Sequence, residues 1–145
     1  MIKKYVNEIY PRRLWVLGED DFDKFRKEFR IDDGEGSEID ENALYNKGAL
    51  TIRCYELKSR ELGCAIILRE NWDYTLPMIL DIVAHEACHA TIHTSSTLGV
   101  GCSDDNSEPF CYLIGFYARC IGHYIQNEMN YKVQKHDSKV QEAAA

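Results

Sequence analysis

Two histidines and a glutamate form an H-E-x-x-H pattern at His85, Glu86 and His89. Residues four apart lie on the same face of a helix, so both imidazoles can reach one metal ion. Glu86 lies about 100° round the helix from His85, where its carboxylate can reach a water molecule bound to that metal. The spacing therefore predicts two zinc ligands and a general base. The alternative is a chance pair of helical histidines.

A catalytic zinc site of this kind needs a third protein ligand and keeps one position for water. Glu108 is the best candidate, because it opens a helical segment whose next two turns are almost wholly apolar. A carboxylate that enters an apolar helix interface is costly unless it meets a cation. The alternative is an ordinary acid at a helix N-terminus, where the helix dipole stabilises negative charge.

Other candidates for the third ligand rank below Glu108. A straight helix places His93 about 12 Å along the axis from His85, too far to share one ion with both motif histidines. Asp104 and Asp105 precede Glu108 in a flexible segment and are the reserves. Asp81, one turn before His85, is either a hydrogen-bond partner that orients a ligand or an ordinary helix acid.

Hydrophobic periodicity predicts an α+β fold in which a short, mostly antiparallel sheet packs on the motif helix and on a C-terminal helix. The expected strands are 13–17, 49–57 and 64–69, the last two paired as a hairpin, and the expected helices are 21–30, 75–94 and 107 to past 124. We expect strand 64–69 to be the sheet edge beside the metal. Small residues on the last helix should let it approach the motif helix closely and hold Glu108 against the histidines: Cys111, Gly115, Ala118 and Gly122.

Length and composition indicate one domain over residues 1–145, with a polar and frayed tail from about 132 to 145. The formal net charge of −7 argues against nonspecific nucleic-acid binding, which needs a basic face. No apolar run reaches the length of a membrane span, and no apolar run follows Met1 as in a secretory leader. We therefore expect a soluble, cytoplasmic protein with no membrane partner.

With its motif helix and a glutamate opening the next helix, the chain resembles the zincin metallopeptidases of the gluzincin type. The stretch from Asn106 to Leu113 also resembles small H-E-x-x-H proteins of phages and mobile elements. Thermolysin-like enzymes carry an aspartate four residues after the ligand glutamate, and here that position is Tyr112. Tyr112 is therefore predicted to orient a zinc histidine or to face the substrate. Neither the large C-terminal domain of those enzymes nor an oxyanion-stabilising histidine is identifiable.

The resemblance implies a small zincin-like domain that acts as a zinc-dependent peptidase on a peptide or protein substrate, in the cytoplasm of a bacterial or phage-infected cell. His85, His89 and Glu108 would bind Zn²⁺, and Glu86 would be the general base for a zinc-bound water. One alternative is a non-catalytic protein, a binding module or a phage structural or regulatory component, in which zinc joins two helices. Another is a zinc hydrolase of a non-peptide amide. The sequence predicts no particular oligomeric state.

Overall fold

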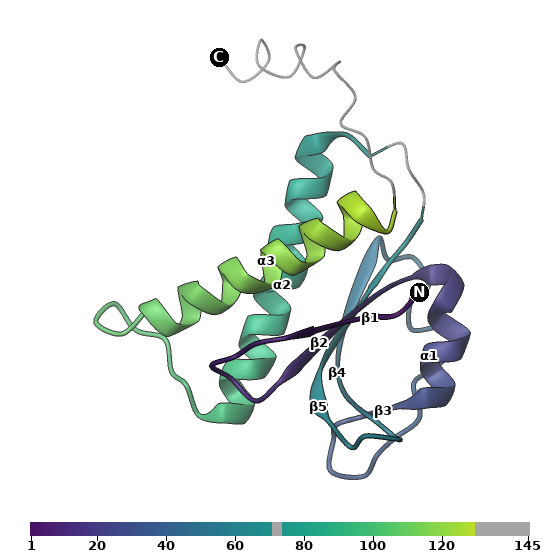
Figure 1. Cartoon of the computed structure of the whole chain (residues 1–145), viewed down its shortest axis with the longest axis horizontal. Coiled ribbons are helices and arrows are strands. Elements are labelled where there is room, and N and C mark those ends of the chain that lie inside the picture. Colours follow the sequence, from purple (N-terminus) through teal and green to yellow (C-terminus); the bar gives the residue numbers. More distant parts are fainter. Residues whose placement is uncertain (71–73, 130–145) are drawn as a thin grey trace.

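The computed structural model describes residues 1–70 and 74–129 and contains one five-stranded sheet (Figure 1). The strands are β1 (Lys3–Val6), β2 (Arg13–Gly18), β3 (Phe29–Ile31), β4 (Ala49–Glu56) and β5 (Leu62–Leu68). Their order across the sheet is β1-β2-β5-β4-β3, with β2 and β5 parallel and the other neighbours antiparallel. The expected α+β class and mostly antiparallel sheet are confirmed.

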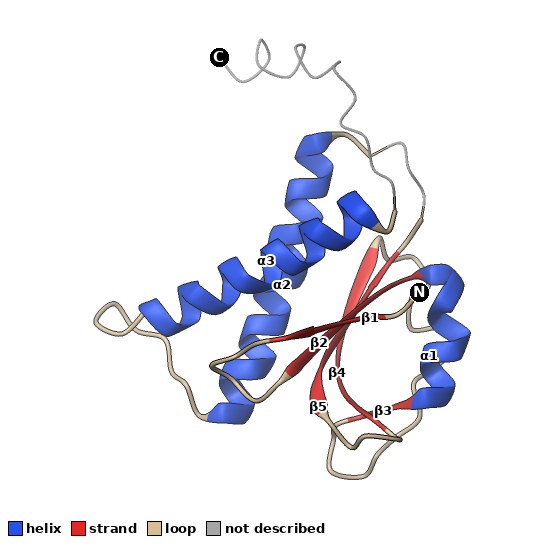
Figure 2. Cartoon of the chain, viewed as in Figure 1, coloured by secondary structure: helices blue, strands red, loops and turns tan. Residues whose placement is uncertain are grey.

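Helices cover both faces of this sheet. The long helices α2 (Leu76–Leu98) and α3 (Glu108–Asn127) cross each other on one side, and the short helix α1 (Phe22–Glu28) lies on the other, after a 3-10 turn, η1 (Glu19–Asp21) (Figure 2). Successive residues of a strand point to opposite faces, so Leu14 and Val16 join the α2 and α3 side, whereas Trp15 and Leu17 join the α1 side. The result is two hydrophobic cores that share the sheet.

The helix that carries the motif has well-defined ends. The Thr75 hydroxyl accepts a hydrogen bond from the Met78 amide, and Pro77 occupies the first turn, where a missing N–H costs nothing. Gly99 ends the helix in the left-handed conformation, at φ 68°. The helix is continuous between these ends and runs one turn beyond the predicted Thr94, so its motif histidines have regular helical spacing.

Two details of the predicted elements are corrected by the structure. β1 was not predicted, and its four residues alternate only weakly in polarity. The helix expected over 21–30 ends at Glu28, and Phe29 begins β3. The parallel pairing of β2 with β5 brings the Arg13 carbonyl to 1.9 Å from where a Cβ atom on Gly63 would stand, so this position admits only glycine. The polar tail expected at 132–145 lies outside the described residues.

The predicted hairpin of β4 and β5 is confirmed, but β5 is not a sheet edge. It is hydrogen-bonded to β2 on one side and to β4 on the other. Periodicity assigns strands but not their order, because order depends on pairing between distant segments. β4, which among the described residues has no strand beside its first residues on the side away from β5, borders the motif helix there, and its Thr51 hydroxyl bonds the Glu86 carboxylate.

The strip of small residues on α3 does not lie against α2. Cys111 and Gly115 are exposed, and a Cβ atom added at Gly115 or Gly122 would meet nothing within 4 Å. The α3 face that packs in the core carries larger side chains: Leu113, Tyr117, Cys120, Ile121, Tyr124 and Ile125. The prediction was wrong because the large apolar residues, which gain more from burial than glycine does, determine which face turns inward.

Candidate metal and catalytic cleft

His85 and His89 point their imidazoles at one another from successive turns of α2. The two Nε2 atoms lie 3.1 Å apart, with the ring planes at 72°. Both side chains are exposed to solvent. The predicted convergence of the two imidazoles is therefore present in the structure.

This separation suits two corners of a zinc site. Two nitrogens each about 2.05 Å from a tetrahedral zinc ion stand about 3.3 Å apart. The same separation also suits a hydrogen bond between one protonated and one bare ring nitrogen. The donor set thus fits a metal ion through two ligands, and metal binding would replace the imidazole–imidazole contact.

Glu86 is the most buried charged residue of this region, with 6% of its surface exposed. Its carboxylate accepts a hydrogen bond from the Thr51 hydroxyl of β4. A buried carboxylate is costly unless it is hydrogen-bonded, and this contact fixes the direction of the side chain. Glu86 therefore stands between the histidine face of α2 and the sheet, ready to bond a water molecule in the cleft.

An open cleft of about 640 Å³ contains these groups. Its floor and walls come from two segments, residues 47–51 at the start of β4 and the stripe of α2 that carries Asp81, Ile82, His85, Glu86, His89 and His93. β4 and α2 run in the same direction here, since Thr51 contacts Glu86, and Arg53 lies with His93 at a small adjoining pocket. The cleft is thus an elongated trough with the histidine pair and Glu86 near its middle.

The wall formed by β4 has free backbone groups. The Gly48 carbonyl accepts a hydrogen bond from the Arg69 amide, and the Glu56 amide donates to the Glu61 carbonyl. Because hydrogen-bonded residues alternate along an antiparallel pair, the even-numbered residues of β4 are the ones that bond β5. The odd-numbered residues therefore face the other way, but β3 pairs with β4 only over Cys54–Glu56. Within residues 1–70 and 74–129, the N–H and C=O groups of Ala49 and Thr51 have no ladder partner.

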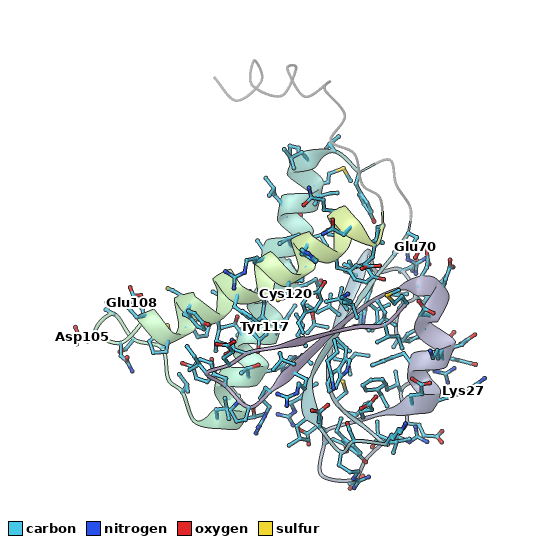
Figure 3. The ribbon with its side chains drawn as sticks, viewed as in Figure 1. Lys27, Glu70, Asp105, Glu108, Tyr117 and Cys120 are labelled. Atoms are coloured by element: carbon cyan, nitrogen blue, oxygen red, sulfur yellow. The ribbon has the colours of Figure 1, made fainter. Side chains whose placement is uncertain are left out.

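Glu108 is not brought to the histidine pair. It is exposed at the outer end of α3, close to Asp105 and far from the sheet (Figure 3). α3 packs on the opposite side of α2, because Ala87, about 200° round the helix from His85, shares a core with it, and Thr94 bonds the Tyr117 hydroxyl. Among the described residues, no group of three or more His, Cys, Asp or Glu side chains is placed to hold a metal. Ligation by Glu108 stays a prediction from spacing.

The remaining predicted residues divide between the cleft and the surface. Tyr112 lies outside the cleft, 43% exposed, with its ring 6.4 Å from that of Tyr10. Asp104 and Asp105 are exposed in the loop before α3. His93 and Asp81 both line the cleft. The pKa of His93 is lowered by burial first, then by the charges of Arg53 and His89.

Sequence reasoning missed the part that β4 plays in the site. Thr51 bonds Glu86, Lys47 lines the same cleft, and Arg53 lies next to its His93 end. The alternation that places Thr51 and Arg53 on the polar face of the strand is visible in the sequence. That this face meets the motif helix is a long-range contact that no local pattern encodes.

No protein-family model, no curated protein and no solved structure matches this chain, so the interpretation of the site depends on its own residues. The resemblance to zincins rests on the motif and on the glutamate after it. Within the part of the chain that the structure describes, neither long helix has the continuous apolar length that a bilayer crossing requires.

Proposed function

We propose that this protein is a zinc-dependent metallopeptidase in which His85 and His89 bind the metal and Glu86 is the general base. The observation that carries the proposal is the convergence of the two Nε2 atoms, 3.1 Å apart, in a cleft that also holds a buried carboxylate. A site that only stabilises structure has no need of a base beside its ligands. Both histidines belong to α2, so the geometry gives no support to a zinc ion that joins α2 to α3.

The roles of the residues follow from their positions. Zinc, when bound, supplies Lewis acidity that lowers the pKa of a coordinated water to about 7 and polarises a carbonyl group. Glu86 would accept the proton of the attacking water and return it to the leaving amine. The Thr51 hydroxyl, which donates to the Glu86 carboxylate, would keep that carboxylate aimed into the cleft during both transfers. Glu108 is left out of this scheme as a ligand, since it lies on the far side of α2.

The free edge of β4 supports an extended peptide as the substrate. A peptide that lies along the cleft can bond the unpaired N–H and C=O groups of Ala49 and Thr51, as an added strand. Side chains on that added strand would alternate between the sheet face and the histidine face. The scissile carbonyl would then be held beside the histidine pair by backbone contacts that tolerate many sequences.

Metal analysis tests the first half of the proposal. Wild-type protein loaded with Zn²⁺ and dialysed should retain about one zinc per chain, and His85→Ala and His89→Ala should each lose it. His123→Ala is the matched control, because His123 is exposed on α3 and lies outside the cleft. Glu108→Gln should retain zinc; loss of zinc from this variant would restore the ligand predicted from spacing. Equal zinc uptake by the wild type and both alanine variants would overturn the proposal.

Hydrolysis tests the second half. Incubation of the zinc-loaded protein with a degenerate peptide library, read by mass spectrometry, should reveal cleaved bonds. Glu86→Gln should bind zinc normally and lower the rate by about 10²- to 10⁴-fold, the usual contribution of general acid–base catalysis. Full activity in that variant would remove Glu86 from the mechanism. Turnover of small acyl amides without any cleavage of peptides would identify a hydrolase of non-peptide amides instead.

A further inference from the structure

The far end of the cleft carries a cation that the proposed chemistry does not use. Arg53 follows Thr51 by two residues on β4, so both side chains project from the same face of the sheet, toward α2. A narrow crevice with no room for a water molecule lies next to the cleft; His93 lines both, and Arg53 and Arg12 border the crevice. Arg53 is therefore placed where the trough between β4 and α2 ends.

The guanidinium of Arg53 is held in place but not fully used. Its Nε–H donates to the Asp32 carbonyl over 2.9 Å, and the Asp32 carboxylate lies 3.8 Å from the same nitrogen. The four N–H bonds of the two terminal nitrogens have no hydrogen-bond partner among residues 1–70 and 74–129. The side chain is 37% exposed, so these donors can be reached from solvent. An anchored guanidinium with free terminal donors is suited to bidentate binding of a carboxylate.

The charges around this crevice favour an anion. The charged or titratable groups that border it are Arg12, Arg53, Asp32 and His93, as well as the buried thiol of Cys64. Burial raises the pKa of that thiol to about 12, so it carries no charge near neutral pH. Two guanidinium groups thus face one carboxylate, whereas the chain as a whole has a formal net charge of −7. This local excess of positive charge on an acidic protein would favour an anionic group of a ligand beside Arg53 and not anions over the whole surface.

We infer that Arg53 determines specificity by binding a carboxylate of the substrate peptide at the far end of the cleft, an inference that rests on the proposed peptidase function. Residues of an extended chain that lie two apart are separated by about 6.6 Å, as are Thr51 and Arg53 along β4. The carboxylate would therefore belong to a residue one or two positions from the cleaved bond. It is either an aspartate or glutamate side chain or the free C-terminus of a short peptide.

Matched peptides provide the test. Each bond that the library identifies is placed in three peptides. The first has an amidated C-terminus and a glutamate one or two residues from the cleaved bond, and the second is the same peptide with glutamine at that position. The third has the glutamine and ends in a free carboxylate two residues after the bond. Zinc-loaded wild type should prefer a peptide with a carboxylate by about tenfold in kcat/KM. Preference for the first peptide identifies a side chain as the source, and preference for the third identifies the terminus.

Variants connect this preference to Arg53. Arg53→Gln should bring the ratio of kcat/KM for the carboxylate peptide to kcat/KM for the neutral peptide down to about one. Asp32→Asn, which removes the competing carboxylate, should increase the preference, and this opposite change cannot result from poor folding. Arg119→Gln is the charge-matched control, because Arg119 is exposed on α3 and should behave as the wild type. Equal cleavage of all three peptides by the wild type would overturn the inference while leaving the peptidase proposal intact.

A separate measurement covers a protein that binds zinc but cleaves no library peptide. Binding of the three peptide types, fluorescently labelled and drawn from the library at random, is then measured by anisotropy on zinc-loaded Glu86→Gln protein. Binding that depends on the carboxylate and is lost in the Arg53→Gln, Glu86→Gln double variant supports the inference even though the peptidase proposal has failed. Binding that is equal for all three peptides, or undetectable for all, overturns the inference.

Discussion

The two faces of the sheet bury different kinds of residues. On the α1 face, every buried residue of the core is apolar, with the rings of Phe25 and Phe29 stacked at 4.5 Å. On the other face, α2 buries Glu86, Thr91, Thr94 and Ser95 beside its apolar residues. One face of the sheet thus holds an apolar core, whereas the other also buries polar groups, of which Glu86, Thr91 and Thr94 have hydrogen-bond partners and the Ser95 hydroxyl has none among the described residues.

This difference affects how each face of the sheet contributes to stability. Apolar burial stabilises the fold at about 25 cal/mol per Å², whereas a buried carboxylate such as Glu86 costs free energy that its hydrogen bond only partly offsets. Apolar burial on both faces stabilises the fold, and only the α2 face also buries a carboxylate. We expect single substitutions on the two faces to differ in size, and only the paired replacement of Thr51 and Glu86 on the α2 face to differ in sign.

The largest effect should come from the apolar face. Phe25 is fully buried between Phe22 and Phe29, so Phe25→Ala should lower the free energy of unfolding by about 3–5 kcal/mol. Urea denaturation followed by circular dichroism measures this loss. Tyr45→Ala is the control, because Tyr45 is 72% exposed and should change stability by less than about 0.5 kcal/mol. A loss below about 1 kcal/mol for Phe25→Ala would contradict the placement of Phe25 in a tightly packed core.

A smaller loss is expected within the polar interior of the other face. The hydroxyls of Thr94 and Tyr117 bond each other over 2.6 Å where α2 meets α3, and both side chains are buried. Tyr117→Phe leaves the Thr94 hydroxyl without its partner and should cost about 1–3 kcal/mol. In a double-mutant cycle, Thr94→Val with Tyr117→Phe should cost less than the sum of the two single changes. Strict additivity would show that the two hydroxyls do not depend on each other.

The smallest effect should have the opposite sign. Replacing both partners of the bond between Thr51 and Glu86, as Thr51→Val with Glu86→Leu, removes a buried carboxylate together with its donor. Such paired apolar replacements are neutral or stabilising, so the free energy of unfolding should rise by up to about 1 kcal/mol. The same denaturation experiment measures it on metal-free protein. A loss comparable to that of Phe25→Ala would mean that Glu86 is a structural residue.

The parts of this structure that depend on near neighbours were predictable. The spacing of His85 and His89 determines their common face whatever the rest of the chain does, and the alternation of Leu50, Thr51 and Ile52 determines which side chains of β4 share a face. Thr75 likewise determines the start of α2 through local geometry, whereas the end was predicted at Thr94, one turn before Gly99 ends the helix. These features follow from the regular periods of helix and strand.

The parts that depend on distant partners were not predictable. Nothing near Gly63 in the sequence indicates that β2 will pair beside it, and so the central position of β5 could not be inferred. The face of α3 that turns inward was misjudged, because Gly115 and Gly122 suggested close packing while Leu113 and Tyr117 in fact supply it. The expected meeting of Glu108 with the histidines depended on the same orientation of α3, and its ligation of a metal stays a prediction.

The short unpaired stretch of β4 limits the affinity with which a peptide can bind along this edge. Ala49 and Thr51 each present one amide and one carbonyl, so an incoming strand has only a few backbone bonds to gain, each contributing about 0.5–1.5 kcal/mol. A peptide bound at this edge would dissociate quickly. The two products of a cleavage would dissociate faster still, because each keeps only some of these backbone hydrogen bonds. A long exposed edge strand would instead favour aggregation between copies of the protein. β3 covers the edge of β4 from Cys54 onward, which keeps the exposed part short.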